Sequence, residues 1–149
     1  MKTILLTALL AFPALSKAEL PSEIQNLAGR LGTFTSIYNG KNIEKETGTD
    51  CKIEESRYGS GSVVIDSVTY FTPTAHLEGA KRTEKNGVIT YVTASNGKRA
   101  GGSICGDFIP LTSYKQSVIV TKNSLTLKQN YSCAFFERHE IIESCTVKN

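Results

Sequence analysis

The chain contains no tryptophan, a single methionine and only two histidines among its 149 residues. His76 and His139 lie far apart in the sequence, and neither belongs to a motif with a second imidazole. The segment HEIIE, residues 139–143, ends in glutamate where the zinc-protease motif has its second histidine. The aspartates are isolated and lack the spacing of a calcium loop. The sequence therefore predicts no metal and no cofactor.

Motifs for covalent or phosphate chemistry are missing as well. The stretches Gly59–Val63 and Gly101–Gly106 do not match G-x-S-x-G, and neither follows the strand-to-helix pattern that exposes a nucleophilic serine. The chain has neither a phosphate-binding GxxxxGK motif nor a dinucleotide GxGxxG motif. The neighbouring acids Glu54 and Glu55 would point to opposite faces of a strand and could not converge on a substrate. We therefore expect a protein that is not an enzyme.

Neither sign of charge dominates the chain. It has 17 lysines and arginines against 14 aspartates and glutamates. Lys2 and Lys17 lie in the first 18 residues, so the remainder carries a net charge of about one positive unit. A basic footprint of the kind that binds nucleic acid is absent, and we expect no nucleic-acid partner.

Long apolar runs are confined to the N-terminus, where one lysine precedes an apolar stretch from Ile4 to Leu15. Ser16 and Ala18 are small residues at the positions that determine cleavage of a signal peptide. The stretch is shorter than the roughly 20 residues that a membrane-spanning helix needs. We expect residues 1–18 to be a signal peptide, with no membrane span. Residues 19–149 would form one domain in the periplasm or outside the cell.

Four cysteines remain in the expected mature chain: Cys51, Cys105, Cys133 and Cys145. An even number in an exported protein predicts two disulfides. The sequence alone leaves their pairing open, and we favour Cys133–Cys145 with Cys51–Cys105. In that arrangement the segment CAFFERHEIIESC is a hairpin. Residues 138–140 would be its three-residue turn, with His139 facing solvent.

Helical pattern is limited to the start of the expected mature chain. In PSEIQNLAGRLG, Ser22 stands three residues before Gln25, which is the spacing of a capping box. Ile24, Leu27 and Ala28 share one face, and Gly29 is expected to end the helix. We expect about two helical turns here.

The rest of the chain alternates between strand and turn residues. LTLKQNYSC, residues 125–133, places Leu125, Leu127, Gln129, Tyr131 and Cys133 on one face, which is typical of an antiparallel sheet with one buried side. Asn-Gly pairs at 39–40, 86–87 and 96–97 indicate tight hairpins. The expected strands cover residues 33–38, 51–58, 62–71, 75–83, 88–94, 106–111, 117–121, 124–133 and 141–147. They predict an all-β fold, an up-and-down barrel of about eight strands, with a β-sandwich as the alternative.

A short helical turn followed by LGTFTSIYNG and a run of hairpins resembles the start of lipocalin-type (calycin) barrels. In that family a Gly-x-Trp motif opens the first strand, and Gly32-Thr33-Phe34 stands at the matching place with phenylalanine instead of tryptophan. The family's arginine that packs on this tryptophan has Arg138 as a candidate. The resemblance implies a barrel that holds a small apolar or amphipathic ligand.

Two sets of residues are candidates for binding. The expected barrel interior would hold the ligand with Val64, Tyr70, Tyr91, Leu125, Leu127 and Tyr131. The alternative function is a protein–protein module, such as an inhibitor of a hydrolase, which would use the loop residues Lys98, Arg99 and Arg138.

Overall fold

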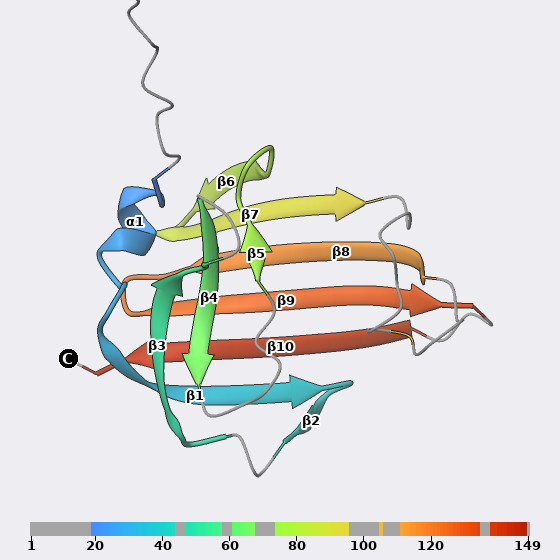
Figure 1. Cartoon of the computed structure of the whole chain (residues 1–149), viewed down its shortest axis with the longest axis horizontal. Helices are drawn as coiled ribbons and strands as arrows, with labels where there is room; N and C mark the ends of the chain where they lie inside the picture. Colours follow the sequence, from blue (N-terminus) through green and yellow to red (C-terminus); the bar gives the residue numbers. More distant parts are fainter. Residues whose placement is uncertain are drawn as a thin grey trace, which may run out of the picture.

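The computed structural model describes residues 19–43, 47–57, 61–67, 74–95, 105, 111–134 and 138–148. These contain one short helix and ten strands, which are shown in Figure 1. In chain order they are α1 (Ser22–Gln25), β1 (Leu31–Tyr38), β2 (Lys41–Asn42), β3 (Asp50–Glu55), β4 (Ser62–Ser67), β5 (Ala75–His76), β6 (Lys81–Lys85), β7 (Val88–Ser95), β8 (Leu111–Val120), β9 (Ser124–Cys133) and β10 (Arg138–Val147).

All ten strands belong to one antiparallel sheet with the order β5-β4-β3-β1-β10-β9-β8-β7-β6, and β2 pairs with β1 off this path. The all-β prediction is therefore confirmed. Among the described residues the sheet has two ends, β5 and β6, and it does not close into a barrel. The expected strand at 75–83 is interrupted by a turn at Glu78–Gly79, and of the expected strand at 106–111 only Leu111 lies within the described residues.

The sheet bends sharply at β1. Strands β3, β4 and β5 cross in front of one half of the longer strands β1, β10, β9 and β8 (Figure 1). Gly32 in β1 pairs with Val147 of β10 on one side and with Cys51 of β3 on the other. A Cβ at Gly32 would lie 2.7 Å from both the Sγ of Cys145 and the backbone oxygen of Thr146. The bend therefore requires glycine at this position.

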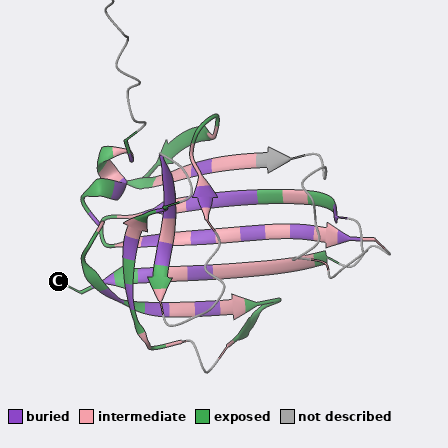
Figure 2. Cartoon of the chain, in the orientation of Figure 1, coloured by how far each residue is buried: buried purple, intermediate pink, exposed green. Residues whose placement is uncertain are grey.

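The main core fills the space between strands β3 to β5 and the half of the long strands that they cover. Its side chains come from α1, the short strands and the covered half of the long strands, as the buried segments in Figure 2 show. Phe34, Ile53, Ile65, Leu125 and Leu127 are fully buried in it. A second, smaller cluster of Leu111, Tyr131 and Cys133 lies at the other end of β8 and β9.

Helix α1 packs one end of this core and is shorter than predicted. Pro21 stands at its N-cap without a side-chain capping bond. The predicted capping box is wrong, because the Ser22 hydroxyl bonds to Glu23 and the Gln25 amide donates to the Leu20 carbonyl. Gly29, with φ of 73°, ends the helical turns as expected. None of the described helices is long and apolar enough to cross a membrane.

The four cysteines form two disulfides, as predicted, but the predicted pairing is wrong. The bonds are Cys51–Cys145 and Cys105–Cys133. Cys51 and Cys145 lie on strands that flank β1, and their side chains meet over Gly32, which has no side chain to separate them. Cys145 lies beside Leu125, at the end of β9 opposite Cys133, so roughly 26 Å of strand would separate the predicted partners.

The predicted turn at residues 138–140 is also wrong. Arg138 pairs with Ser132 and His139 pairs with Tyr131, so both residues belong to β10. Strand β9 ends at Cys133 and β10 begins at Arg138, and of the residues between them only Ala134 is described. His139 consequently stands half-buried on the inner face of the sheet instead of at a solvated tip.

Candidate functional site

The inner face of the long strands changes character along its length. The half covered by β3, β4 and β5 is apolar, whereas the next positions along the strands carry polar side chains that are still buried. Ser36, Gln116, Gln129 and Glu143 are only 1%, 3%, 7% and 4% exposed. They lie on β1, β8, β9 and β10, and the strand registers place all four on the inner face. We call these four residues the polar belt.

Two glutamines of the polar belt make defined side-chain hydrogen bonds. The Gln116 amide nitrogen donates to the backbone oxygen of Thr74, next to β5, at 3.2 Å. The Gln129 amide nitrogen donates to the Tyr114 hydroxyl at 3.0 Å. Because a buried amide without partners costs about 1–3 kcal/mol, these bonds fix both side chains in place.

Beyond the polar belt lies an aromatic row of Tyr38, His139, Tyr131 and Tyr114, one residue from each of the strands β1, β10, β9 and β8. The His139 ring stacks on Tyr131 with centroids 4.9 Å apart and on Tyr38 at 6.0 Å. The Tyr38 hydroxyl and His139 Nδ1 share a hydrogen bond of 2.7 Å. Burial, together with the neighbouring Tyr38, raises the pKa of Tyr131 to about 12, so its hydroxyl stays protonated at neutral pH.

The side chains at this end of the sheet are of the kinds that recognise a bound molecule. They combine aromatic faces, which bury apolar surface, with amide, hydroxyl, imidazole and carboxylate groups that form hydrogen bonds. All four cysteines of the chain are in disulfides, so there is no thiol nucleophile. Within the described ranges, no group of three or more metal-binding side chains comes together.

The structure separates the residues predicted to hold a ligand. Leu125, Leu127 and Tyr91 are packed in the main core, while Tyr131 belongs to the aromatic row. Val64 pairs with Glu54 on the face of β4 opposite to that of Ile65, because alternate residues of a strand point to opposite sides. Tyr70 lies outside the described residues.

The loop residues predicted to contact a protein partner can be placed only in part. Lys98 and Arg99 lie outside the described residues. Arg138 is exposed at the start of β10, on the face opposite to that of His139. It therefore neither stands in a turn nor packs near Phe34, where the lipocalin resemblance would place an arginine.

Sequence reasoning missed the polar belt, although one signal for it was present. The alternation in LTLKQNYSC puts Gln129 on the buried face between two leucines and a tyrosine. A polar residue at such a position indicates a site that needs an explanation. Ser36, Gln116 and Glu143 carry no comparable local signal, because their burial depends on the pairing of four strands.

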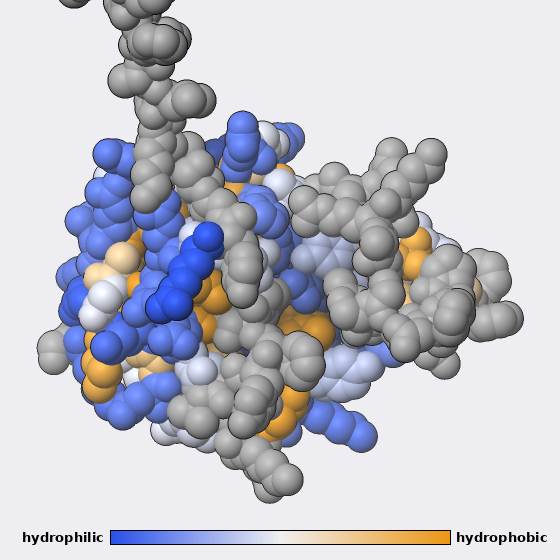
Figure 3. Space-filling model, in the orientation of Figure 1, coloured by the Kyte–Doolittle hydropathy of each residue, from blue (hydrophilic) through white to orange (hydrophobic). Residues whose placement is uncertain are grey.

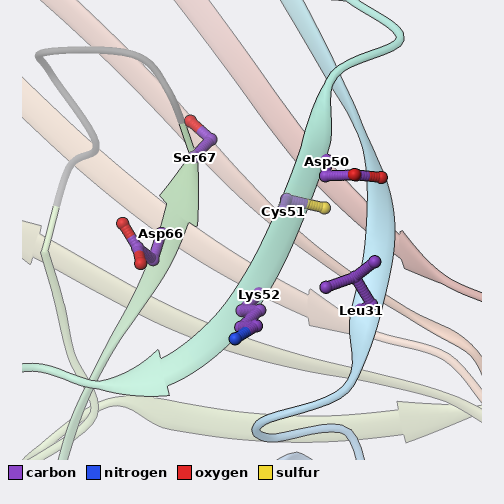
Figure 4. A pocket seen from close by; sticks show the side chains of 6 residues that line it. All are labelled: Leu31, Asp50, Cys51, Lys52, Asp66 and Ser67. Carbon is purple, nitrogen blue, oxygen red and sulfur yellow. The ribbon is translucent and has the colours of Figure 1, made fainter.

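A second feature is a hollow of about 280 Å³ on the outer surface, where β1, β3 and β4 meet. Figure 4 shows its lining side chains, which are Leu31, Asp50, Cys51, Lys52, Asp66 and Ser67. Leu31 is 45% exposed and is one of three large hydrophobic residues exposed on the described surface. The surrounding described surface is largely hydrophilic in the space-filling view (Figure 3).

Comparison with known proteins does not assign this chain to a family. No protein-family model matches the chain, and no curated protein matches it. A solved chain described as a "putative outer membrane protein" from Bacteroides fragilis is similar over 85% of this chain and 52% of its own length. The two are 11% identical, with a TM-score of 0.40. This chain thus spans about half the length of that protein.

Proposed function

We propose that this chain is an exported, non-catalytic binding protein that holds a small amphipathic molecule at the polar belt and the aromatic row. The observation that supports this is the burial of four polar side chains on an inner face whose covered half is apolar. In this proposal the ligand lies at the other half of the long strands from most of the apolar residues that were predicted to line a barrel interior. It does not require a closed barrel.

The physical reason lies in the cost of burying polar groups. A small β-protein gains most stability from an apolar inner face, and each buried amide or carboxylate must be compensated by hydrogen bonds. Departures from the local hydrophobic pattern concentrate at functional positions. A ligand with a flat or apolar body and hydrogen-bonding groups would satisfy the aromatic row and the polar belt together.

Two disulfides in a chain of this size support export, because such bonds persist in oxidising compartments. The N-terminal segment has a lysine, an apolar stretch and small residues before Glu19, and this pattern of a signal peptide also supports export. We therefore assign the mature protein to the periplasm or the outside of the cell.

The filled main core favours one alternative, a module that binds a protein partner, such as an inhibitor of a hydrolase. Beneath β3 to β5 the described side chains pack against one another, as in a solid core. Native mass spectrometry of protein purified without denaturation from its own source separates the two functions. A bound species of small-molecule mass supports our proposal, a co-purifying protein of defined stoichiometry supports the alternative, and bare protein contradicts both.

A further inference from the structure

The hollow between β1, β3 and β4 presents one positive and one negative charge that are not paired with each other. Lys52 and Asp66 stand directly opposite each other in the register of β3 and β4 and share the outer face. Both are exposed, and neither makes an ion pair within the described part of the chain. Oppositely charged side chains in this arrangement usually attract each other across the strands.

The remaining charge in the hollow is already balanced. The Lys148 ammonium donates to the Asp50 carboxylate at 2.7 Å. This leaves Lys52 as the cationic group and Asp66 as the anionic group available to a bound molecule. A ligand that complements the hollow therefore carries both charges and no net charge.

The apolar surface that lines the hollow narrows the choice of ligand further. Leu31 on β1 pairs with Lys52, so its exposed side chain lies beside the ammonium-bearing strand. Cys51 also lines the hollow (Figure 4), but it is only 3% exposed, so Leu31 supplies the apolar surface. An aliphatic group on the ligand would cover this surface, while a carboxylate meets Lys52 and an ammonium meets Asp66.

We propose that the hollow binds a small zwitterion with an aliphatic side chain, of the class of free aliphatic amino acids. This site is separate from the polar belt and the aromatic row, and it does not depend on the function proposed for them. Because exposed charge contacts contribute little individually, the affinity lies in the millimolar range.

The test uses the ¹⁵N-labelled protein, expressed with its own leader and titrated by NMR with L-leucine. Two comparison ligands each remove one charge: L-leucinamide lacks the carboxylate and 4-methylpentanoate lacks the ammonium. We expect saturable shifts of the amides of Leu31, Cys51 and Asp66 with L-leucine, and about threefold to fivefold weaker binding of either comparison ligand.

Two variants test which charged group of the ligand contacts Lys52 and which contacts Asp66. In Lys52→Gln, L-leucine should bind no better than L-leucinamide, because the carboxylate has lost its contact. In Asp66→Asn, L-leucine should bind no better than 4-methylpentanoate. Lys85→Gln, a change of another exposed lysine on β6, the last strand of the sheet, is the control and should leave all three affinities unchanged. The proposal is overturned if L-leucine gives no saturable shifts, if all three ligands bind alike, or if the two hollow variants behave like the control.

Discussion

Removing the disulfide Cys51–Cys145 should cost more stability than removing Cys105–Cys133. The first bond joins residues 94 positions apart and the second joins residues 28 positions apart. In the chain-entropy account, closing loops of these lengths stabilises the folded state by about 4.7 and about 3.6 kcal/mol, respectively. Cys51 and Cys145 are also buried in the main core, at the point where β3 and β10 flank β1.

The assay is urea unfolding of two double variants, Cys51→Ala with Cys145→Ala and Cys105→Ala with Cys133→Ala. We expect both to be destabilised, the first by about 1 kcal/mol more than the second. A peptide map of the wild-type protein under non-reducing conditions verifies the pairing itself. An equal or reversed order of stabilities, or a map that joins Cys133 to Cys145, would refute the reasoning.

Three further predictions concern the bend, the helix and the aromatic row. Gly32→Ala should destabilise the fold by about 1–3 kcal/mol in urea unfolding, because the new Cβ meets Cys145 and Thr146, whereas the exposed change Thr33→Ala should have little effect. The hydrogen bond from Tyr91, 2.5 Å long, and the nearby Arg82 lower the pKa of Glu23 from 4.5 to about 2. Stability from Glu23 should thus be complete above pH 4.5 and be lost as the pH falls toward 2, while Glu23→Gln should remove that pH dependence together with about 1 kcal/mol at neutral pH. Alkaline titration followed by tyrosine absorbance should show a hydroxyl with a pKa of about 12 that is missing in Tyr131→Phe. Because the pKa of Tyr131 is raised, the stability that this hydroxyl contributes is present below pH 10 and is lost as the pH rises toward 12. A titration of Tyr131→Phe indistinguishable from the wild type would contradict the burial of Tyr131.

Local pattern predicted the strand with the strictest alternation well, but it missed that Leu111–Val120 is one continuous strand, β8, where the predicted strands ended at 111 and began again at 117. The strand at Ser124–Cys133 has the predicted bounds, because its strict alternation of apolar and polar residues leaves one register for burial. Gly29 ends the helical turns as predicted, because its positive φ is a property of a single residue. A strict alternation and a positive φ can thus be derived from the sequence, whereas the local capping box could not, because Ser22 and Gln25 bond to other groups.

Features set by strand order could not be derived. The pairing of Cys51 with Cys145 depends on β1 lying between β3 and β10 and on Gly32 leaving room for the sulfurs. The predicted turn at residues 138–140 lies midway between Cys133 and Cys145. That prediction depended on a bond between these two cysteines, which do not pair with each other. Residues 138–140 also offer no glycine for the left-handed position that three-residue hairpin loops favour.

The polar belt illustrates the same limit for function. Gln129 could be recognised as polar on a buried face, but its proximity to Tyr114, and the burial of Gln116 against Thr74, arise only when β5, β8 and β9 are assembled. The predicted interior residues were chosen for hydrophobicity, and that criterion selects the core and passes over the polar belt.

The most direct test of the proposed binding site is native mass spectrometry of the wild-type protein beside Gln116→Leu and Lys115→Leu. Gln116 faces inward in the polar belt, and Lys115 is its exposed neighbour on the outer face of β8. Our account predicts that the wild type and Lys115→Leu carry the same small noncovalent ligand and that Gln116→Leu, still folded by circular dichroism, loses it. Retention of the ligand by Gln116→Leu, or its loss from both variants, would contradict the account.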